Sequence, residues 1–156
     1  MPGRLARDIK QSKPFHSERQ EAFFNLLRTT EHLSREASHL LKDQDLSQTQ
    51  YNVLRILRGA GEAGLPCSEI GNRLISHDPD VTRLIDRLEK RGLVSRNRDS
   101  ADRRVITIRL TPAGLALVEG SDADRKLDAV LAPYFARLAP GDCQILITLL
   151  ENLRES

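Results

Sequence analysis

The chain contains 156 residues, of which 39% are hydrophobic and 29% charged, and its formal net charge is +2. This length predicts a single domain with a substantial core, and no apolar run approaches the roughly 18 residues of a membrane span. The first residues lack the apolar stretch of a secretory signal, and Cys67 and Cys143 match no metal-ligand spacing. We therefore expect a cytoplasmic protein with reduced thiols rather than a membrane or secreted protein.

The first predicted element is a long helix. Residues 1–14 are polar, contain two prolines and show no hydrophobic periodicity, so we expect a mobile N-terminal tail there. From about His16 to Leu41, side chains that recur every three or four positions predict one helix: Phe23, Leu26, Leu27, Thr30, Leu33, Ala37, Leu40 and Leu41.

The second predicted helix begins after a break at Asp45–Ser47. The Ser47 oxygen can accept a hydrogen bond from the first turn, and Gln50 stands where a capping box requires it. The helix should end at Gly59–Gly61, and its apolar side chains are Tyr51, Val53, Leu54, Ile56 and Leu57.

Two short helices joined by a turn are predicted next. The first spans about Cys67–Leu74, after a turn in which Pro66 suits a first helical position. The second begins at Pro79 with Asp78 as its cap. Its apolar stripe consists of Val81, Leu84, Ile85 and Leu88. Such a pair of helices predicts a helix-turn-helix.

A β-hairpin and two further helices complete the chain. Alternating side chains predict two strands joined by a loop at 99–104: Leu93–Arg98 and Val105–Leu110. A long helix runs from Thr111–Pro112 to about Tyr134, where Pro133 should end or bend it, and a last helix begins at Pro140. The order α-α-α-α-β-β-α-α predicts a mainly α protein with a small β-hairpin wing, a winged helix-turn-helix flanked by long helices.

Positive charge is concentrated in the second short helix and the hairpin. Between Arg83 and Arg109, nine Lys and Arg residues stand against four Asp and Glu residues, a net charge of +5. A basic helix suits the major groove of DNA, and an arginine-bearing hairpin tip suits the minor groove or the backbone. The alternative is a solvated charged face on an ordinary helix.

Five segments carry a family resemblance in their order and spacing: residues 46–57, 68–74, 81–93, 98–104 (RDSADRR) and 110–114 (LTPAG). Over about residues 20–155 the chain resembles the MarR family of bacterial transcriptional regulators. The resemblance implies a homodimer in which each chain reads half of a pseudo-palindromic operator in double-stranded DNA. It also implies a cleft for small, often aromatic or phenolic, molecules that alter DNA affinity. The corresponding regions are a tail at 1–14, a dimerisation region at 15–45 and 112–156, and a DNA-binding domain at 46–111.

The charge pattern and the resemblance together give the candidate DNA-binding residues: Ser47, Gln48, Ser76, His77, Asp80, Thr82, Arg83, Arg87, Arg103 and Arg104. Thr82 and the start of the second helix can bond phosphates. Arg83 can contact a guanine edge or a phosphate. Arg87 is nearly as well explained by an ion pair with Asp86 or Glu89 of its own helix.

Acidic residues leave alternatives open at this site. Asp80 can accept from a cytosine amino group, or it can pair inside the protein, and such acidic residues depart from the small hydroxyl or basic residues common in the family. In the hairpin loop, Asp99 and Asp102 can hold one guanidinium and leave the other arginine free for DNA. The family implies this division between Arg103 and Arg104.

The predicted effector site lies between the first two helices and the helix after Thr111, with Leu27, Glu31 and Tyr51 as candidate lining residues. An exposed polar helix face explains a further set of side chains better than a metal site does: His32, Glu36 and His39. We predict no metal, no cofactor and no catalytic residues, and we expect both cysteines to be small buried residues.

These expectations combine into a homodimeric repressor, relieved by a small ligand such as a phenol, that is not an enzyme. It would act in the bacterial cytoplasm, at the nucleoid when DNA-bound. Two alternatives are a thiol-based redox-sensing regulator that uses Cys67 or Cys143, and a winged-helix module for protein–protein contact.

Overall fold

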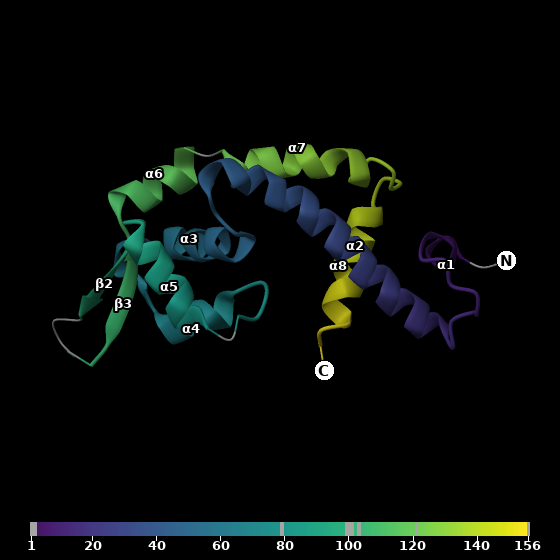
Figure 1. Cartoon of the computed structure of the whole chain (residues 1–156), viewed down its shortest axis with the longest axis horizontal. Helices are drawn as coiled ribbons and strands as arrows, with labels where there is room; N and C mark the ends of the chain where they lie inside the picture. Colours follow the sequence, from purple (N-terminus) through teal and green to yellow (C-terminus); the bar gives the residue numbers. More distant parts are fainter. Residues whose placement is uncertain (1–2, 79, 99–101, 103, 121, 156) are drawn as a thin grey trace. The chain divides into compact units, whose positions relative to one another are not determined.

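The structure, a computed structural model, describes residues 3–78, 80–98, 102, 104–120 and 122–155. The chain forms two compact units, Met1–His39 and Leu40–Ser156. α1 and most of α2 belong to the first unit, and the second unit contains all later elements (Figure 1). Within the described residues, no helix is both long and apolar enough to cross a bilayer.

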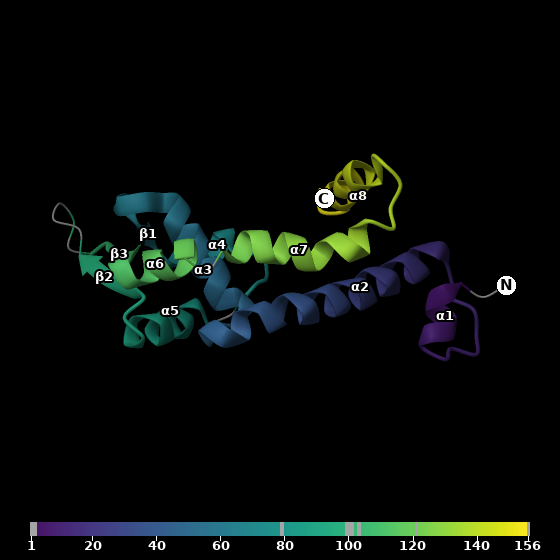
Figure 2. The ribbon, with the colours of Figure 1, turned by 90° about the horizontal axis from the view of Figure 1, so that it is seen from above.

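The first unit contains α1 (Arg4–Asp8) and most of α2 (Glu18–Leu41). α2 confirms the predicted long helix. α1 is an element that the sequence pattern did not predict in the expected tail: Leu5 is 5% exposed, and the helix lies beside the beginning of α2 (Figure 2). A helix of five residues is too short to show a hydrophobic period, so the pattern could not reveal it.

The second unit contains the helix-turn-helix, a small sheet and the C-terminal helices. Its elements are η1 (Lys42–Gln44), α3 (Gln48–Ala60), η2 (Gly61–Ala63), β1 (Leu65–Pro66), α4 (Cys67–Arg73), α5 (Val81–Lys90), β2 (Val94–Arg98), β3 (Ile106–Leu110), α6 (Pro112–Gly120), α7 (Ala123–Phe135) and α8 (Asp142–Asn152). α3 begins at the predicted capping box: Ser47 Oγ accepts from the Gln50 backbone N–H at 3.1 Å, and Gln50 Oε1 accepts from that of Ser47 at 2.9 Å.

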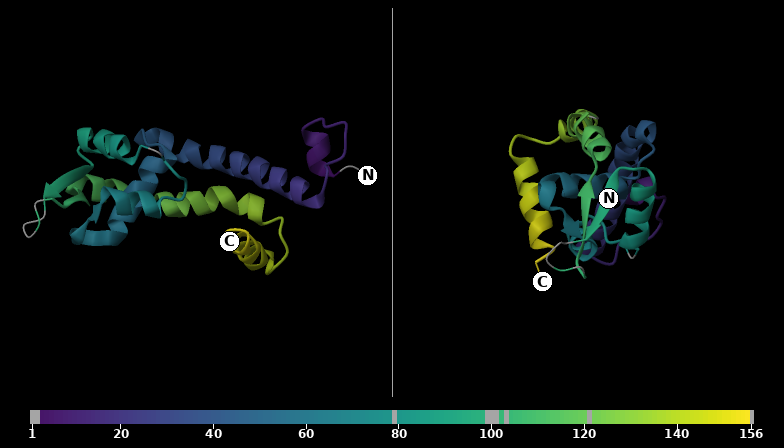
Figure 3. Two further views of the ribbon diagram at one scale, coloured as in Figure 1. Left: turned by 90° about the horizontal axis from the view of Figure 1, so that it is seen from below. Right: turned by 90° about the vertical axis from the view of Figure 1, so that its left-hand side faces the viewer.

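The hairpin belongs to a three-stranded antiparallel sheet with the order β1-β3-β2. β2 and β3 pair from Val94 opposite Leu110 to Arg98 opposite Ile106, so the two predicted strands are confirmed and each begins one residue later than expected. β1 lies where the sequence predicted only a turn, and it pairs with the middle of β3. The hairpin extends away from the short helices as a wing (Figure 3).

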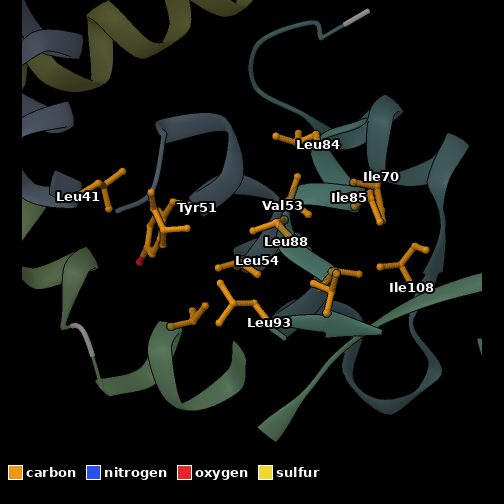
Figure 4. Packing of buried hydrophobic residues seen from close by; sticks show 14 of the residues in the cluster. Leu41, Tyr51, Val53, Leu54, Ile70, Leu84, Ile85, Leu88, Leu93 and Ile108 are labelled. Atoms are coloured by element: carbon orange, nitrogen blue, oxygen red, sulfur yellow. The ribbon is translucent and has the colours of Figure 1, made fainter. Parts of the chain in front are cut away.

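A shared core holds α5 against α3, α4 and the sheet (Figure 4). The largest fully buried side chains come from all of these elements: Val53, Leu54, Leu57, Ile70, Ile85, Leu88, Val94 and Ile108. The apolar stripe predicted for α5 is confirmed, with Val81 half-buried at its beginning. Burying each such side chain contributes about 1.5–3 kcal/mol, so the core fixes which side of α5 faces outward.

The long helix predicted from Pro112 to Tyr134 is divided in two. α6 ends at Gly120 and α7 begins at Ala123, and Asp122 between them has a left-handed backbone with φ 49°. Glycine costs about 1 kcal/mol in a helix interior, which favours a break at this point. Pro133 lies in the last turn of α7, as the sequence predicts.

Candidate nucleic-acid interface

Two aspartates organise the turn before α5. Asp78 Oδ1 accepts from the backbone N–H of Asp80 at 2.8 Å, and Asp80 Oδ1 accepts from that of Arg83 at 3.1 Å. Asp80 is therefore the N-cap of α5, and the prediction that Asp78 caps this helix is wrong. The physical reason is the start of the helix at Val81, which leaves the N–H of Arg83 within reach of Asp80. Pro79 lies outside the described residues.

Asp80 also pairs with the side chain of Arg83. Its Oδ2 lies 3.7 Å from Arg83 Nε, and the two side chains are 54% and 72% exposed. These two interactions favour the role of Asp80 inside the protein over the reading of a base. An exposed ion pair contributes only about 0–1 kcal/mol, so a phosphate or a base edge can replace Asp80 at the guanidinium at little cost.

The outward side of α5 is basic and polar. Thr82, Arg83 and Arg87 are all exposed there, and Ser76 and His77 are exposed in the preceding turn. Arg83 and Arg87 are one helical turn apart and lie opposite the buried stripe. We call these five residues the α5 surface. Asp86 and Glu89, which the sequence suggested as ion-pair partners of Arg87, bind Arg96 instead.

Arg96 is a residue of this region that sequence reasoning did not single out. It lies on β2, its side chain is 27% exposed, and its guanidinium donates to Asp86 Oδ1 at 2.5 Å and to Glu89 Oε2. Burial alone would lower the pKa of Arg96, but hydrogen bonds to Asp86 and Glu89 raise it above its usual value. The side chain therefore stays cationic and joins the wing to α5.

The beginning of α3 is tied to the other end of α5. Arg91, which follows α5, donates to the carbonyl oxygens of Gln44 at 2.9 Å and of Asp45. Ser47 is exposed, and its Oγ accepts from the Gln50 N–H, so the hydroxyl hydrogen can still be donated to a phosphate. Gln48 is half-buried.

The wing contributes Arg104, whose side chain is exposed just before β3. Its backbone N–H donates to Asp102 Oδ1 at 2.9 Å, so this carboxylate holds the backbone of the loop. Arg103 and Asp99 lie outside the described residues. The predicted pairing of one loop guanidinium with Asp99 and Asp102 therefore stays a prediction.

Two of the three candidate effector residues share a hollow in the first unit. Its volume is about 270 Å³. Leu27 and Glu31 line it together with Leu5 of α1, Ile9 directly after α1, and Phe24 and Arg28 of α2. Glu31 also pairs with Arg35 at 3.1 Å. Tyr51 belongs to the second unit, where it is 8% exposed within the core cluster.

A second hollow, of about 440 Å³, lies between the end of α3 and the beginning of α6, two of the three elements between which the sequence predicted the effector site, but none of the candidate effector residues lines it. Leu57 and Arg58 at the end of α3, Arg109 and Leu110 of β3, and Leu115 of α6 are among its lining residues. No sequence motif marks it, because its walls come from segments far apart in the chain.

Neither the two cysteines nor the histidines of α2 form a recognisable reactive or metal-binding group among the described residues. Cys67 is half-buried with its Sγ 3.9 Å from Thr82 Oγ1, and Cys143 is exposed in the single chain, so the expectation that both are buried is wrong. Cys143 lies on α8, a helix in which no described side chain is buried. Among the described residues, His32, Glu36 and His39 do not form a group that could hold a metal ion.

Comparisons with known proteins agree with this arrangement. The sequence profile of the MarR family matches residues 46–106. A MarR transcription factor from Planctomyces limnophilus has a solved structure that is 38% identical in sequence, with a TM-score of 0.65, and the match covers 88% of this chain and 98% of that one. The HTH-type transcriptional repressor IacR of Pseudomonas putida is 32% identical over 133 residues, which are 85% of this chain and 75% of the relative.

A third comparison concerns regulation. BpsR of Bordetella bronchiseptica is 26% identical with a TM-score of 0.77, over 92% of this chain and 99% of that one, and its structure is described as a mechanism for the regulation of DNA binding by 6-hydroxynicotinic acid. With the winged helix-turn-helix described above, these similarities identify the chain as a member of the MarR family, a DNA-binding transcriptional regulator and not an enzyme.

Proposed function

We propose that the protein is a homodimeric repressor that binds a pseudo-palindromic operator and is released from it by a small aromatic or phenolic ligand. In this proposal α5 enters the major groove, and the wing contacts the adjacent minor groove or backbone. The observation that carries it is the α5 surface: Arg83 and Arg87 stand one turn apart on a helix whose opposite side is fully engaged in the core.

The roles of the individual residues follow from their chemistry. Arg83 and Arg87 carry planar donors that match a guanine edge or a phosphate. Short polar side chains position the protein on phosphates: Ser47, Gln48, Ser76, His77 and Thr82. Arg103 and Arg104 approach the minor groove, whose negative potential attracts arginine. Asp80 serves the site by holding Arg83 until DNA replaces it.

Exposed apolar side chains support the dimer. On and just beyond α8, five such side chains are 37–70% exposed in the single chain: Ile145, Leu146, Ile147, Leu149 and Leu153. On α2, Phe23 is 55% exposed. Monomers rarely leave so many apolar side chains in water on single helices, and a two-fold axis would let two copies cover them mutually. The same axis would present two α5 helices to half-sites about 34–36 Å apart.

A hollow on α2 supports the effector site. Leu27, Phe24 and Ile9 offer apolar surface for a ring, and Arg28 offers a cation for a carboxylate or phenolate. The small molecule named for BpsR, 6-hydroxynicotinic acid, combines a hydroxylated ring with a carboxylate. We propose that Leu27 and Glu31 contact such a ligand, and a contact by Tyr51 stays a prediction. The repressor mode is proposed by analogy with IacR.

Action in the cytoplasm, at the nucleoid when DNA-bound, is proposed from the DNA target. The redox alternative stays a prediction for Cys67 and Cys143, and it would appear as a loss of DNA affinity on peroxide treatment that a Cys→Ser substitution abolishes.

The experiment is a selection of bound fragments from a random duplex pool, followed by titration of the selected operator at several salt concentrations. We expect a pseudo-palindrome and, for about 6–10 phosphate contacts, a fall in affinity of roughly 10³–10⁵-fold between 50 and 200 mM salt. An enriched pool without two-fold symmetry would contradict the dimeric reading. A nearly flat salt response would favour the protein-contact alternative.

A further inference from the structure

Arg96 joins the wing to α5 through three hydrogen bonds. Its Nη2 donates to Asp86 Oδ1 at 2.5 Å, its Nη1 donates to Glu89 Oε2, and its backbone N–H donates to Glu89 Oε1 at 3.2 Å. The two carboxylates are 49% and 39% exposed, whereas Arg96 is only 27% exposed. One arginine therefore bridges two positions of α5 that are three residues apart.

The geometry of this bridge is restrictive. A guanidinium is planar and presents its donors in a fixed fork, so two simultaneous carboxylate contacts restrain the distance and the orientation of β2 relative to α5, in addition to the packing of the core. Arg96 lies opposite the buried Ile108 of β3, which anchors the base of the hairpin in the core. Two residues further along β2, at about 6–7 Å, Arg98 ends the strand at the wing loop.

The bridge also determines which charges α5 presents. Asp86 lies on the outward side of α5, three residues after Arg83 and four before Lys90, so without a partner it would place a negative charge beside the α5 surface. Arg96 neutralises part of this charge from the wing side. Arg83 and Arg87 are thereby not required as its partners and are left to contact DNA.

We propose that Arg96 is a positioning residue for operator recognition: by bridging Asp86 and Glu89 it restrains the spacing between the α5 surface and the wing more tightly than the core does alone. With this spacing restrained, α5 and the wing contact both grooves together only on a duplex of matching shape, and the shape of a duplex depends on its sequence. Arg96 itself need not touch DNA. The inference rests on the proposed docking of α5 and the wing.

The test compares Arg96→Gln, Arg96→Lys and the triple variant Arg96→Gln/Asp86→Asn/Glu89→Gln with the parent protein. The matched control is Arg125→Gln, which removes an exposed arginine on α7 that pairs with Asp122. For each protein we measure the ratio of affinities for the selected operator and for a random duplex of equal length, together with the thermal unfolding midpoint.

We expect Arg96→Gln to lower this ratio about tenfold, the loss typical of one mismatched base pair, and Arg125→Gln to leave it unchanged. Lysine should restore part of the ratio, because it keeps the charge but cannot form the fork. The triple variant should bind random duplex more tightly than Arg96→Gln does, because it has no unpaired carboxylates at positions 86 and 89. Its ratio of affinities should nevertheless stay low.

Three outcomes would overturn the inference. The first is an unchanged ratio with a lower unfolding midpoint, which would make Arg96 purely structural. The second is full recovery of the ratio in the triple variant, which would mean that Arg96 only neutralises the carboxylates. The third concerns Glu89→Gln, which weakens half of the bridge and replaces Arg96→Gln in the test if that variant does not fold. An unchanged affinity ratio in Glu89→Gln would then overturn the inference.

Arg83→Ala, measured in parallel, separates this inference from the proposed function. Loss of base preference in Arg83→Ala alone would overturn only the role of Arg96. An absence of effect in both series would overturn the docking of α5 as well.

Discussion

The carboxylate of Asp80 caps the backbone N–H of Arg83 at 3.1 Å and lies 3.7 Å from its guanidinium. The residue that opens α5 thus also holds the first arginine of its outward side. Because the pair is more than half exposed, it restrains Arg83 without sequestering it from DNA.

This relationship predicts the effect of Asp80→Asn. Asparagine caps helices as well as aspartate does, so the unfolding midpoint should stay near that of the parent. Operator affinity should rise or remain unchanged because a negative charge near phosphates is removed, and base preference should be retained. The measurement is a titration against the operator and its single-base variants, with Asp78→Asn as the control in the same turn. Loss of preference for one G·C pair in Asp80→Asn alone would show that Asp80 reads a cytosine.

Arg83 and Arg104 are expected to act differently on DNA. Arg83→Ala should cost about 1–3 kcal/mol on the operator and relax preference at one base pair per half-site, if it contacts a guanine edge. Arg104→Ala should weaken binding to operator and random duplex alike, because a wing arginine meets groove shape and backbone. A panel of single-base operator changes distinguishes the two, and identical profiles for both variants would contradict this division.

The exposed side of α8 predicts the response of the proposed dimer to Leu149→Glu. Burial of a leucine contributes about 1.5–3 kcal/mol, and two-fold symmetry counts it twice. We expect the dimer dissociation constant to rise at least 100-fold in analytical ultracentrifugation. Ile75→Glu is the matched control, since Ile75 is also exposed, at 82%, but lies in the turn after α4. A Leu149→Glu protein that remains dimeric at the same concentrations would place the interface elsewhere.

The proposed effector site predicts thermodynamic linkage between ligand and DNA. A coupling of about 1–3 kcal/mol would lower operator affinity roughly 5- to 150-fold, and the operator would weaken ligand binding by the same factor. Calorimetry with 6-hydroxynicotinate and salicylate, with and without operator, measures both. Leu27→Ala should weaken ligand binding, whereas Thr29→Ala, an exposed position on α2 outside the lining of the hollow, should not. Equal affinity for free and DNA-bound protein would argue against ligand-controlled release.

Local sequence signals predict much of this fold because they act over a few residues. The Ser47–Gln50 capping box, the apolar stripe of α5 and the alternation of β3 each depend on neighbours in the chain, and each is confirmed in the structure. Two features were not predicted. The break at Asp122 depends on a left-handed backbone conformation, which aspartate adopts only in a suitable tertiary context. α1 has five residues, too few to show a hydrophobic periodicity.

By itself, the sequence determined the order of the main helices and of the two hairpin strands, the buried side of α5 and the concentration of positive charge on one helix and hairpin, since these are properties of composition and spacing. Only the tertiary structure decided how the charges are shared. Asp86 and Glu89 could have paired with Arg87 on their own helix, but folding brings Arg96 of β2 against them. An ion pair depends on distance in space, and the hairpin that brings Arg96 to α5 is held there by a core whose members lie far apart along the chain.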